Sequence, residues 1–143
     1  MRFMIIVKNS TSGSCASAGM PEGEFLAAMR TFNEELAKAG ALIGLEGLHP
    51  VATGTRVRIS GNRRVVTDGP FAETKEAIGG YWLWELPSKE DAIEWVKRCP
   101  ALASSEGEIE IRQVIDAVDF ADKLAPGLLA PTAPGRPRAA TGN

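Results

Sequence analysis

Apolar residues recur along this chain with two different periods, and these periods predict its helices and strands. Residues 3–7 (FMIIV) form a continuous apolar run, which is typical of a strand buried on both faces. Between Pro21 and Ala39 the apolar residues recur every three or four positions, and this spacing predicts an amphipathic helix. Pro21 suits the first position of that helix and Gly40 suits its end. Its apolar stripe consists of Phe25, Met29, Phe32 and Leu36.

The middle of the chain predicts a hairpin and a further strand. TRVRIS and RRVVT flank Gly61-Asn62, a dipeptide that is typical of a two-residue hairpin turn. Alternation in TRVRIS predicts that Val57 and Ile59 face a core while the intervening arginines face water. Residues 77–86 (AIGGYWLWEL) predict a strand that is largely apolar on both faces.

The last third of the chain predicts a second helix and a final strand. Ser88 is a good N-cap, with Asp91 three residues later, and Pro100 ends the helical pattern. GEIEIRQVI alternates and predicts a half-exposed strand. Residues 117–143 are rich in proline and glycine, and we expect a largely flexible C-terminal extension there.

The order of these elements predicts an α+β fold. Without the hairpin the order is βαββαβ, the split βαβ or ferredoxin-like motif. We therefore predict a ferredoxin-like domain over residues 1–116, with an inserted β-hairpin and both helices on one face of the sheet. Tyr81 and Leu83 make the other face apolar, so we expect a second copy to cover it in a two-fold homodimer.

Composition narrows the class of protein. The chain has 143 residues, of which 44% are hydrophobic and 24% charged, as in a single globular domain. Its net charge of −2 makes nucleic acid an unexpected partner, and no apolar stretch approaches the roughly 18 residues of a membrane span. Cys15 and Cys99 lie outside any CxxC pattern, so we expect free thiols in a cytoplasmic protein and no zinc site. No motif implies a metal or a cofactor.

The stretch at 66–81, VTDGPFAETKEAIGGY, carries the strongest candidate chemistry. Pro70 fixes its own φ and disfavours helix at Gly69. The side chain of Asp68 can accept hydrogen bonds from nearby backbone N–H groups in an Asx-turn. DGPF therefore predicts a rigid bend that holds the Asp68 carboxylate in one orientation and allows Phe71 to enter the core.

This stretch resembles the signature of the DGPF group of YCII-related domain proteins. MRFMIIVK, GLEGLHPVATGTRVRI and EDAIEWVKRCP are similar to the same family, so the resemblance covers roughly residues 1–115. It implies a dimeric α+β barrel of ferredoxin-like subunits. For the wider family it also implies a His–Asp pair in a cleft between helix and sheet, and dehydrochlorinase-type activity in some relatives. DGPF proteins are also similar to products encoded beside extracytoplasmic-function sigma factors.

Each candidate catalytic residue has two interpretations. The resemblance implies a histidine on the first helix, but that helix has none, so only His49 could pair with Asp68. Asp68 is either a general acid/base or a residue that only stabilises the turn. His49 is either a proton shuttle or an ordinary loop residue before a proline.

The candidate ligand-binding residues also have two interpretations each, one functional and one structural. Around the bend they are Gly69, Pro70, Phe71, Glu73, Lys75 and Glu76. The three charged residues either orient a polar ligand, with Lys75 pairing an anionic group, or form a solvated loop. The arginines of TRVRIS either bind an anion or face water. The tryptophans of the chain either stack on a ligand or pack in the core, and Gly79-Gly80 either allows a close approach or forms a β-bulge.

The sequence is compatible with three functions. The leading hypothesis is a cytoplasmic homodimer whose polar cleft at the DGPF bend binds a small molecule and catalyses acid/base chemistry such as elimination or isomerisation. The second is a non-catalytic accessory or regulatory dimer that binds a protein such as a sigma factor, through the dimer surface or residues 126–143. The third is a binder of small ligands without chemistry.

Overall fold

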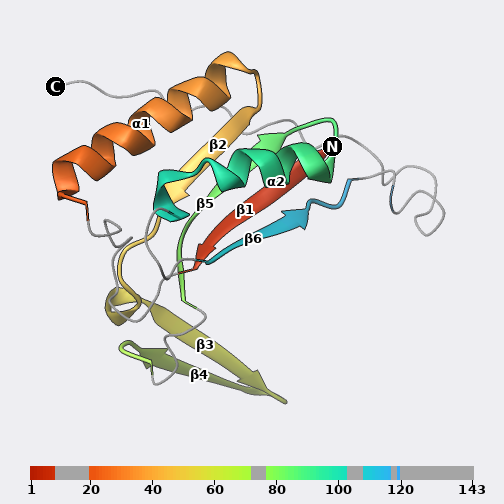
Figure 1. Ribbon diagram of the computed structural model, residues 1–143. Coiled ribbons are helices and arrows are strands. Elements are labelled where there is room, and N and C mark those ends of the chain that lie inside the picture. Colours follow the sequence, from red (N-terminus) through yellow and green to blue (C-terminus); the bar gives the residue numbers. More distant parts are fainter. Residues whose placement is uncertain (9–19, 72–76, 103–107, 117–118, 120–143) are drawn as a thin grey trace, which may run out of the picture.

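The computed structural model describes residues 1–8, 20–71, 77–102, 108–116 and 119 (Figure 1). Four antiparallel strands form one sheet in the order β2-β5-β1-β6. Both helices, α1 and α2, cover the same face of this sheet (Figure 1). This order and these connections are consistent with a ferredoxin-like α+β fold. The bounds are β1 Arg2–Lys8, α1 Glu22–Lys38, β2 Leu42–Gly47, β5 Ile78–Glu85, α2 Lys89–Lys97 and β6 Glu108–Gln113.

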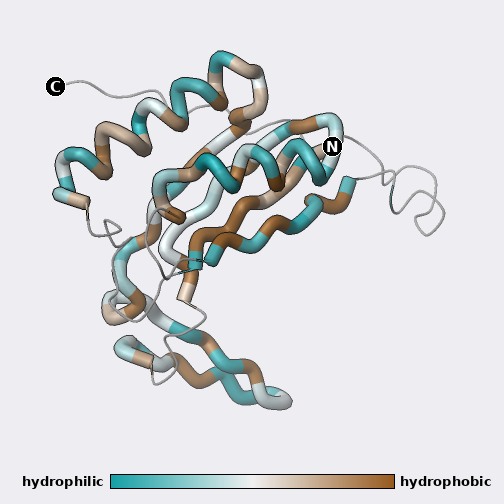
Figure 2. The backbone as a smooth tube through the Cα atoms, viewed as in Figure 1, coloured by the Kyte–Doolittle hydropathy of each residue, from teal (hydrophilic) through white to brown (hydrophobic). Residues whose placement is uncertain are grey.

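The core lies between the sheet and the helices. In β1, Phe3 and Ile5 face the helices and are almost completely buried, as is Trp84 of the neighbouring β5. The apolar character of β1 is visible along the middle of the sheet (Figure 2). Phe32 of α1 packs against Trp82 with ring centroids 6.2 Å apart in an edge-on arrangement. Trp82 and Trp84 therefore pack in the core, which was one of the two alternatives to be distinguished from stacking on a ligand.

Helix α1 follows its predicted stripe closely. Phe25, Phe32 and Leu36 are buried, and Met29 packs against the core. Gly40 has φ +70°, a left-handed conformation that favours glycine. The N–H groups of Gly40 and Ala41 donate to the carbonyl oxygens of Ala37 and Leu36, both at 3.0 Å. This pair of bonds is the Schellman arrangement that ends a helix.

Helix α2 begins where its cap predicts. The Ser88 side chain accepts a hydrogen bond from the Asp91 backbone N–H at 3.1 Å. Ala92 and Val96 are buried against the sheet, as is Cys99 just after the helix. A short 3₁₀ turn, Pro100–Leu102, follows. Among the described helices, none is long and apolar enough to cross a membrane.

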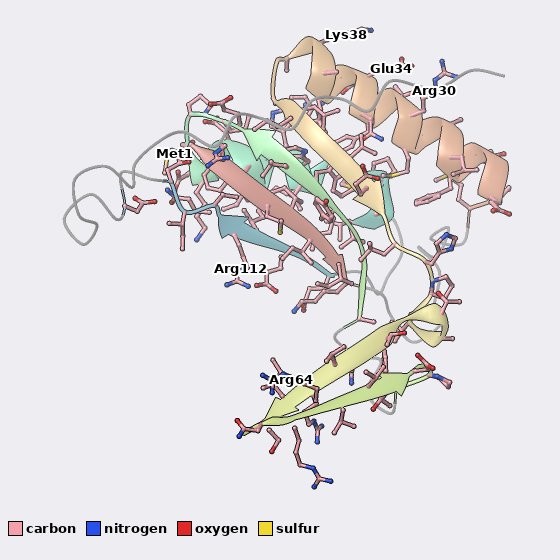
Figure 3. The ribbon with its side chains drawn as sticks, turned by 180° about the vertical axis from the view of Figure 1, so that it is seen from behind. Met1, Arg30, Glu34, Lys38, Arg64 and Arg112 are labelled. Atoms are coloured by element: carbon pink, nitrogen blue, oxygen red, sulfur yellow. The ribbon has the colours of Figure 1, made fainter. Side chains whose placement is uncertain are left out.

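The hairpin forms a separate two-stranded sheet of β3 (Thr55–Ser60) and β4 (Arg63–Asp68). It follows a 3₁₀ turn, η1 (Val51–Thr53), and lies beyond one end of the four-stranded sheet (Figures 1 and 3). The expectation that Val57 and Ile59 face a core is wrong for the single chain, since they are 61% and 67% exposed. The hairpin does not join the larger sheet, so within the described residues neither of its faces is buried.

The second face of the four-stranded sheet has an apolar centre. Met4 pairs with Leu83 and Ile6 pairs with Tyr81 across β1 and β5. Because these residues alternate with the core residues of the same strands, all four lie on the face away from the helices. No helix within the described part of the chain covers this face (Figure 1). We call it the open sheet face.

Candidate functional site

The DGPF bend is tied to the start of β3. The Thr55 hydroxyl donates a hydrogen bond to Oδ1 of Asp68 at 2.8 Å. The Gly69 N–H donates to the Gly54 carbonyl oxygen, also at 2.8 Å. The Gly69–Pro70 peptide bond is cis. The predicted Asx-turn is not among the contacts of the described residues: Asp68 accepts from a threonine side chain instead of a backbone N–H, and the Gly54 carbonyl oxygen holds Gly69.

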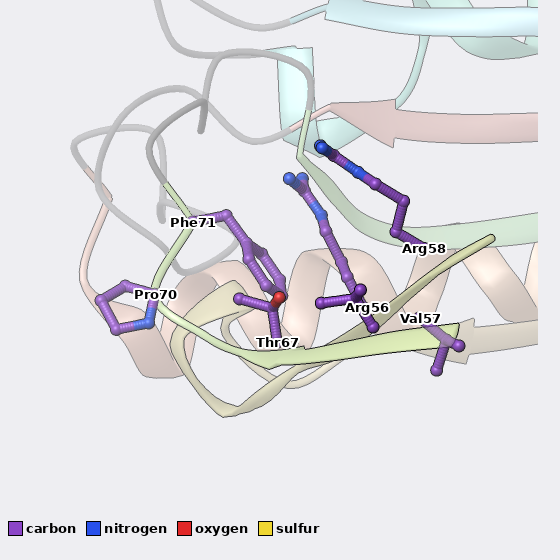
Figure 4. Close-up of a pocket in the computed structure, with 7 residues that line it drawn as sticks. Arg56, Val57, Arg58, Thr67, Pro70 and Phe71 are labelled. Carbon is purple, nitrogen blue, oxygen red and sulfur yellow. The ribbon is translucent and has the colours of Figure 1, made fainter. Parts of the chain in front are cut away.

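A cavity of about 650 Å³, which we call the hairpin cleft, opens on one face of the hairpin beside the bend (Figure 4). Phe71 is half-buried and does not enter the core; its ring lies below the Arg56 guanidinium, whose carbon is 3.9 Å from the ring centroid. The prediction that Phe71 enters the core is therefore wrong, because the ring packs on the hairpin. The cleft is lined by Arg56, Val57, Arg58, Val65, Thr67, Pro70 and Phe71.

Positive charge dominates this cleft. Arg56 and Arg58 are two positions apart on β3, so their side chains leave the same face, and both extend to the same side of the hairpin (Figure 4). Within the described part of the chain, no carboxylate forms an ion pair with either of them. A guanidinium keeps its charge at any physiological pH and matches carboxylate and phosphate oxygens. Two such groups without a carboxylate partner form a site suited to an anion.

Asp68 lies on the other face of the hairpin. It pairs directly with Thr55, whereas Arg56 pairs with Thr67, and successive residues of a strand point to opposite faces. The Asp68 carboxylate is exposed and does not line the hairpin cleft. The predicted cleft and the predicted acid/base are therefore on opposite sides of one two-stranded sheet.

His49 is exposed in the segment after β2. In the single chain it forms neither a hydrogen bond nor an ion pair within 4.0 Å with Asp68. The two residues are thus not assembled as a dyad by the described contacts, and their catalytic roles remain predictions.

A second hollow, of about 290 Å³, lies between α1 and the β2–β5 side of the sheet. Its walls are mostly apolar, with Phe25, Leu26 and Met29 on the helix. Asn33 is its main polar group from the helix; Oδ1 of Asn33 accepts a hydrogen bond from Nε1 of Trp82 at 2.8 Å. We call this hollow the helix–sheet cleft.

Comparison with known sequences decides the family. A sequence model of the YCII-related domain matches residues 1–118 of the chain. The chain belongs to the YCII-related family. A Rhizobium meliloti (strain 1021) protein described as uncharacterized is 26% identical to it over 112 residues, covering 78% of this chain and 90% of the relative.

One solved structure resembles this YCII-related protein in part. It is 5-chloro-2-hydroxyhydroquinone dehydrochlorinase from Burkholderia phenoliruptrix AC1100, in complex with 2,5-dihydroxybenzoquinone. The two chains are 17% identical, and the match covers 80% of this chain and 94% of the enzyme with a TM-score of 0.42. Neither this structure nor the uncharacterized relative assigns an activity to the present chain.

The resemblance implied a His–Asp pair in a cleft between helix and sheet, and this protein departs from that pattern. Its single histidine, His49, is not among the residues that line the helix–sheet cleft. The helix contributes Phe25, Leu26 and Met29 there. Across the described residues, no group of three or more His, Cys, Asp or Glu side chains is placed to hold a metal ion.

Only part of the predicted ligand site can be placed. Pro70 and Phe71 line the hairpin cleft, while Gly69 is half-buried outside it. Glu73, Lys75 and Glu76 lie outside the described residues, as do Cys15 and all of 117–143 except Asp119.

The sequence pattern favoured a solvent-exposed strand face for Arg56 and Arg58, and not an anion-binding site. The useful signal was their i, i+2 spacing, which places both charges on the same face as Thr67 and beside the bend. No carboxylate of the neighbouring strand occupies that face, since Asp68 falls on the other.

Proposed function

We propose that this YCII-related protein binds a small organic anion in the hairpin cleft. The observation that carries the proposal is the pair of guanidinium groups of Arg56 and Arg58, which share one face of the hairpin and have no carboxylate partner among the described residues. The cleft volume of about 650 Å³ falls within the usual range for small-molecule sites, roughly 300–1,000 Å³. The sequence predicted a small-molecule cleft beside the DGPF bend, and the two arginines indicate that its ligand is negatively charged.

The lining residues suggest a division of roles. Arg56 is oriented by its contact with Phe71, so its guanidinium is partly preorganised. Arg58 has no partner among the described side chains and is available for a bidentate contact with a carboxylate or phosphate. The Thr67 hydroxyl can donate a further hydrogen bond, and Val65 with Phe71 offers an apolar wall for the rest of the ligand.

Calorimetric titration with phenyl phosphate and with benzoate tests this proposal, with phenol as the uncharged probe. We expect both anions to bind and phenol to bind at least tenfold more weakly. Arg58→Gln should weaken anion binding by about tenfold or more, since a charge-assisted bond contributes about 1.5–3 kcal/mol. Arg30→Gln, which alters an exposed arginine of α1 paired with Glu34, is the matched control and should bind as the wild type does. Equal affinity for phenol and phenyl phosphate would sink the proposal.

Proton transfer is a separate part of the hypothesis. The Asp68 carboxylate is held by Thr55 on the face opposite the arginines, so anion binding in the cleft does not require it. As an acid/base, Asp68 would be needed for turnover of a bound ligand but not for its binding. Asp68→Asn would then abolish turnover and leave both the ligand Kd and the melting temperature near their wild-type values. A loss of stability with no effect on any turnover would assign Asp68 to the bend alone.

We also propose that the protein forms a two-fold homodimer through the open sheet face. Met4, Ile6, Tyr81 and Leu83 give that face an apolar centre; Ile6 is already buried, and a second sheet packed on the face would remove the half-buried Met4, Tyr81 and Leu83 from water. Sedimentation equilibrium at micromolar concentrations tests the dimer. A single monomeric species across that range would contradict it.

A further inference from the structure

The positive charge of the hairpin continues beyond the hairpin cleft. In the register of β3 and β4, Arg58 lies opposite Val65, and the next pair on the same face is Ser60 with Arg63. Because residues two apart on a strand share a face, Arg63 extends the series that Arg56 and Arg58 begin. Three of the four arginines of the hairpin therefore follow one another on one face. We call Arg56, Arg58 and Arg63 the arginine row.

The fourth arginine of the hairpin, Arg64, has a different environment. It lies opposite Ile59 in the register, which places it on the other face. Its Nη1 donates to the carbonyl oxygens of Gly61 at 3.1 Å and of Arg63 at 3.2 Å, so it is engaged with the turn. The guanidinium of Arg63, by contrast, forms neither a hydrogen bond nor an ion pair with any described residue. It is exposed and available to a ligand.

The arginine row has no negative charge within the hairpin to balance it. The single carboxylate of β3 and β4 belongs to Asp68, which lies on the other face and accepts a hydrogen bond from Thr55. Like charges on neighbouring positions of one face repel one another. A ligand that carries negative charge at two points along the row offsets more of this repulsion than a ligand with one anionic group.

The spacing along the row indicates how far apart these two points lie. Arg58 and Arg63 are diagonal neighbours across the two strands, so their Cβ atoms are roughly 7 Å apart. Val65 lies beside both, directly opposite Arg58 and two residues after Arg63. An apolar residue next to two cations suits a ligand whose anionic groups are separated by an apolar segment of about the size of one ring. The Ser60 hydroxyl, opposite Arg63, can donate a hydrogen bond to the outer group.

We infer that Arg63 is a specificity-determining residue of the hairpin cleft, and that the cleft prefers organic anions with two anionic groups at opposite ends of a ring-sized apolar spacer. This inference rests on the proposed anion site and adds a second anionic group to its ligand.

The two groups have different partners. Arg58, which lines the cleft, holds the first group, as it does for a ligand with one anionic group. Arg63 is not among the lining residues and lies nearer the turn at Gly61, so it contacts only a ligand that extends out of the cleft in that direction. Its guanidinium can form a charge-assisted, bidentate contact with a carboxylate or a phosphate there. Arg63 therefore affects the choice of ligand without being required for anion binding itself.

Calorimetric titration with two related compounds tests the preference. Phenyl phosphate carries one anionic group, and 4-carboxyphenyl phosphate adds a carboxylate at the far end of the ring. We expect 4-carboxyphenyl phosphate to bind about tenfold more tightly, because it gains a charge-assisted contact with Arg63. The isomer 2-carboxyphenyl phosphate has the same two groups on adjacent ring positions and should lack most of this gain. Equal affinities of the two isomers would contradict the spacing, since total charge alone would then account for the preference.

Two variants of neighbouring arginines test the residue. Arg63→Gln should remove the advantage of 4-carboxyphenyl phosphate and leave the Kd of phenyl phosphate within about twofold of the wild type, since salt screens a charge that the ligand does not contact. Arg64→Gln removes the same charge from the opposite face and should keep the advantage. Equal losses in the two variants would overturn the assignment of Arg63. Equal wild-type affinities for phenyl phosphate and 4-carboxyphenyl phosphate would overturn the preference and leave the anion site standing, whereas binding of neither compound would overturn both.

Discussion

Gly69 lies so close to Val51 that no side chain fits between them. A Cβ added to Gly69 would be 2.5 Å from the carbonyl oxygen of Val51 and 2.8 Å from that of Ala52. The second residue of the DGPF bend is therefore fixed as glycine by the backbone of the preceding 3₁₀ turn, which packs against it. This contact, with the bond from the Gly69 N–H to Gly54, joins the base of the hairpin to the segment that precedes it.

Gly69→Ala should accordingly destabilise the base of the hairpin. The added methyl group meets backbone atoms, which cannot move aside as a flexible side chain could, and overpacking of this kind costs roughly 1–3 kcal/mol. We expect a lower urea midpoint together with weaker anion binding in the hairpin cleft. Gly47→Ala is the control, because nothing lies within 4 Å of the added atom there. Wild-type stability and binding in Gly69→Ala would show that the bend tolerates a side chain.

Gly80→Ala should destabilise the pairing of β2 with β5. An added Cβ would lie 2.8 Å from the carbonyl oxygen of Glu46 on the neighbouring strand, and Gly80 is buried. We expect a loss of about 1–3 kcal/mol in the free energy of unfolding, measured with urea. The matched variant Gly44→Ala, also in this pair of strands but with open space around the added atom, should stay within about 0.5 kcal/mol of the wild type. Equal stabilities of the two variants would contradict the close approach.

The bond between Asn33 and Trp82 gives a third prediction. Asn33→Leu removes the oxygen that accepts from Nε1 of Trp82 at 2.8 Å and leaves a donor without its partner in a buried ring. The expected loss is about 1–3 kcal/mol in the free energy of unfolding, followed by tryptophan fluorescence. Glu34→Ala, on the exposed side of the same helix, should change stability by less than about 0.5 kcal/mol. A neutral Asn33→Leu would mean that water satisfies the indole N–H.

The sequence predicted the main elements well where the pattern was local. The stripe of Phe25, Phe32 and Leu36 and the stop at Gly40 define α1 within one residue at each end. Ser88 likewise marks the start of α2. These signals depend on contacts between residues close in sequence, which periodicity and capping preferences describe directly. The Gly79-Gly80 pair allowed two interpretations, and both apply, since Gly80 approaches Glu46 and the β1–β5 register shifts beside it.

The hairpin was harder because its environment is not local. Alternation correctly separates Val57 and Ile59 from Arg56 and Arg58, but it cannot say whether an apolar face meets a core of the same chain. The single chain offers none, so both valine and isoleucine are exposed. The position of Asp68, however, was available from the sequence. Counting outward from the turn at Gly61-Asn62 pairs Asp68 with Thr55 and places it on the face of Val57 and Val66, away from Arg56 and Arg58.

An organic anion that binds in the hairpin cleft must contact Arg56 and Arg58. Titration of phenyl phosphate into protein labelled with ¹⁵N, followed through the arginine Nε–H signals, measures this directly. We predict that the signals of Arg56 and Arg58 shift with a single saturable Kd while that of Arg30 stays in place. Saturable binding that leaves Arg56 and Arg58 unshifted, or that shifts Trp82 and Asn33 of the helix–sheet cleft instead, would contradict the proposed anion site.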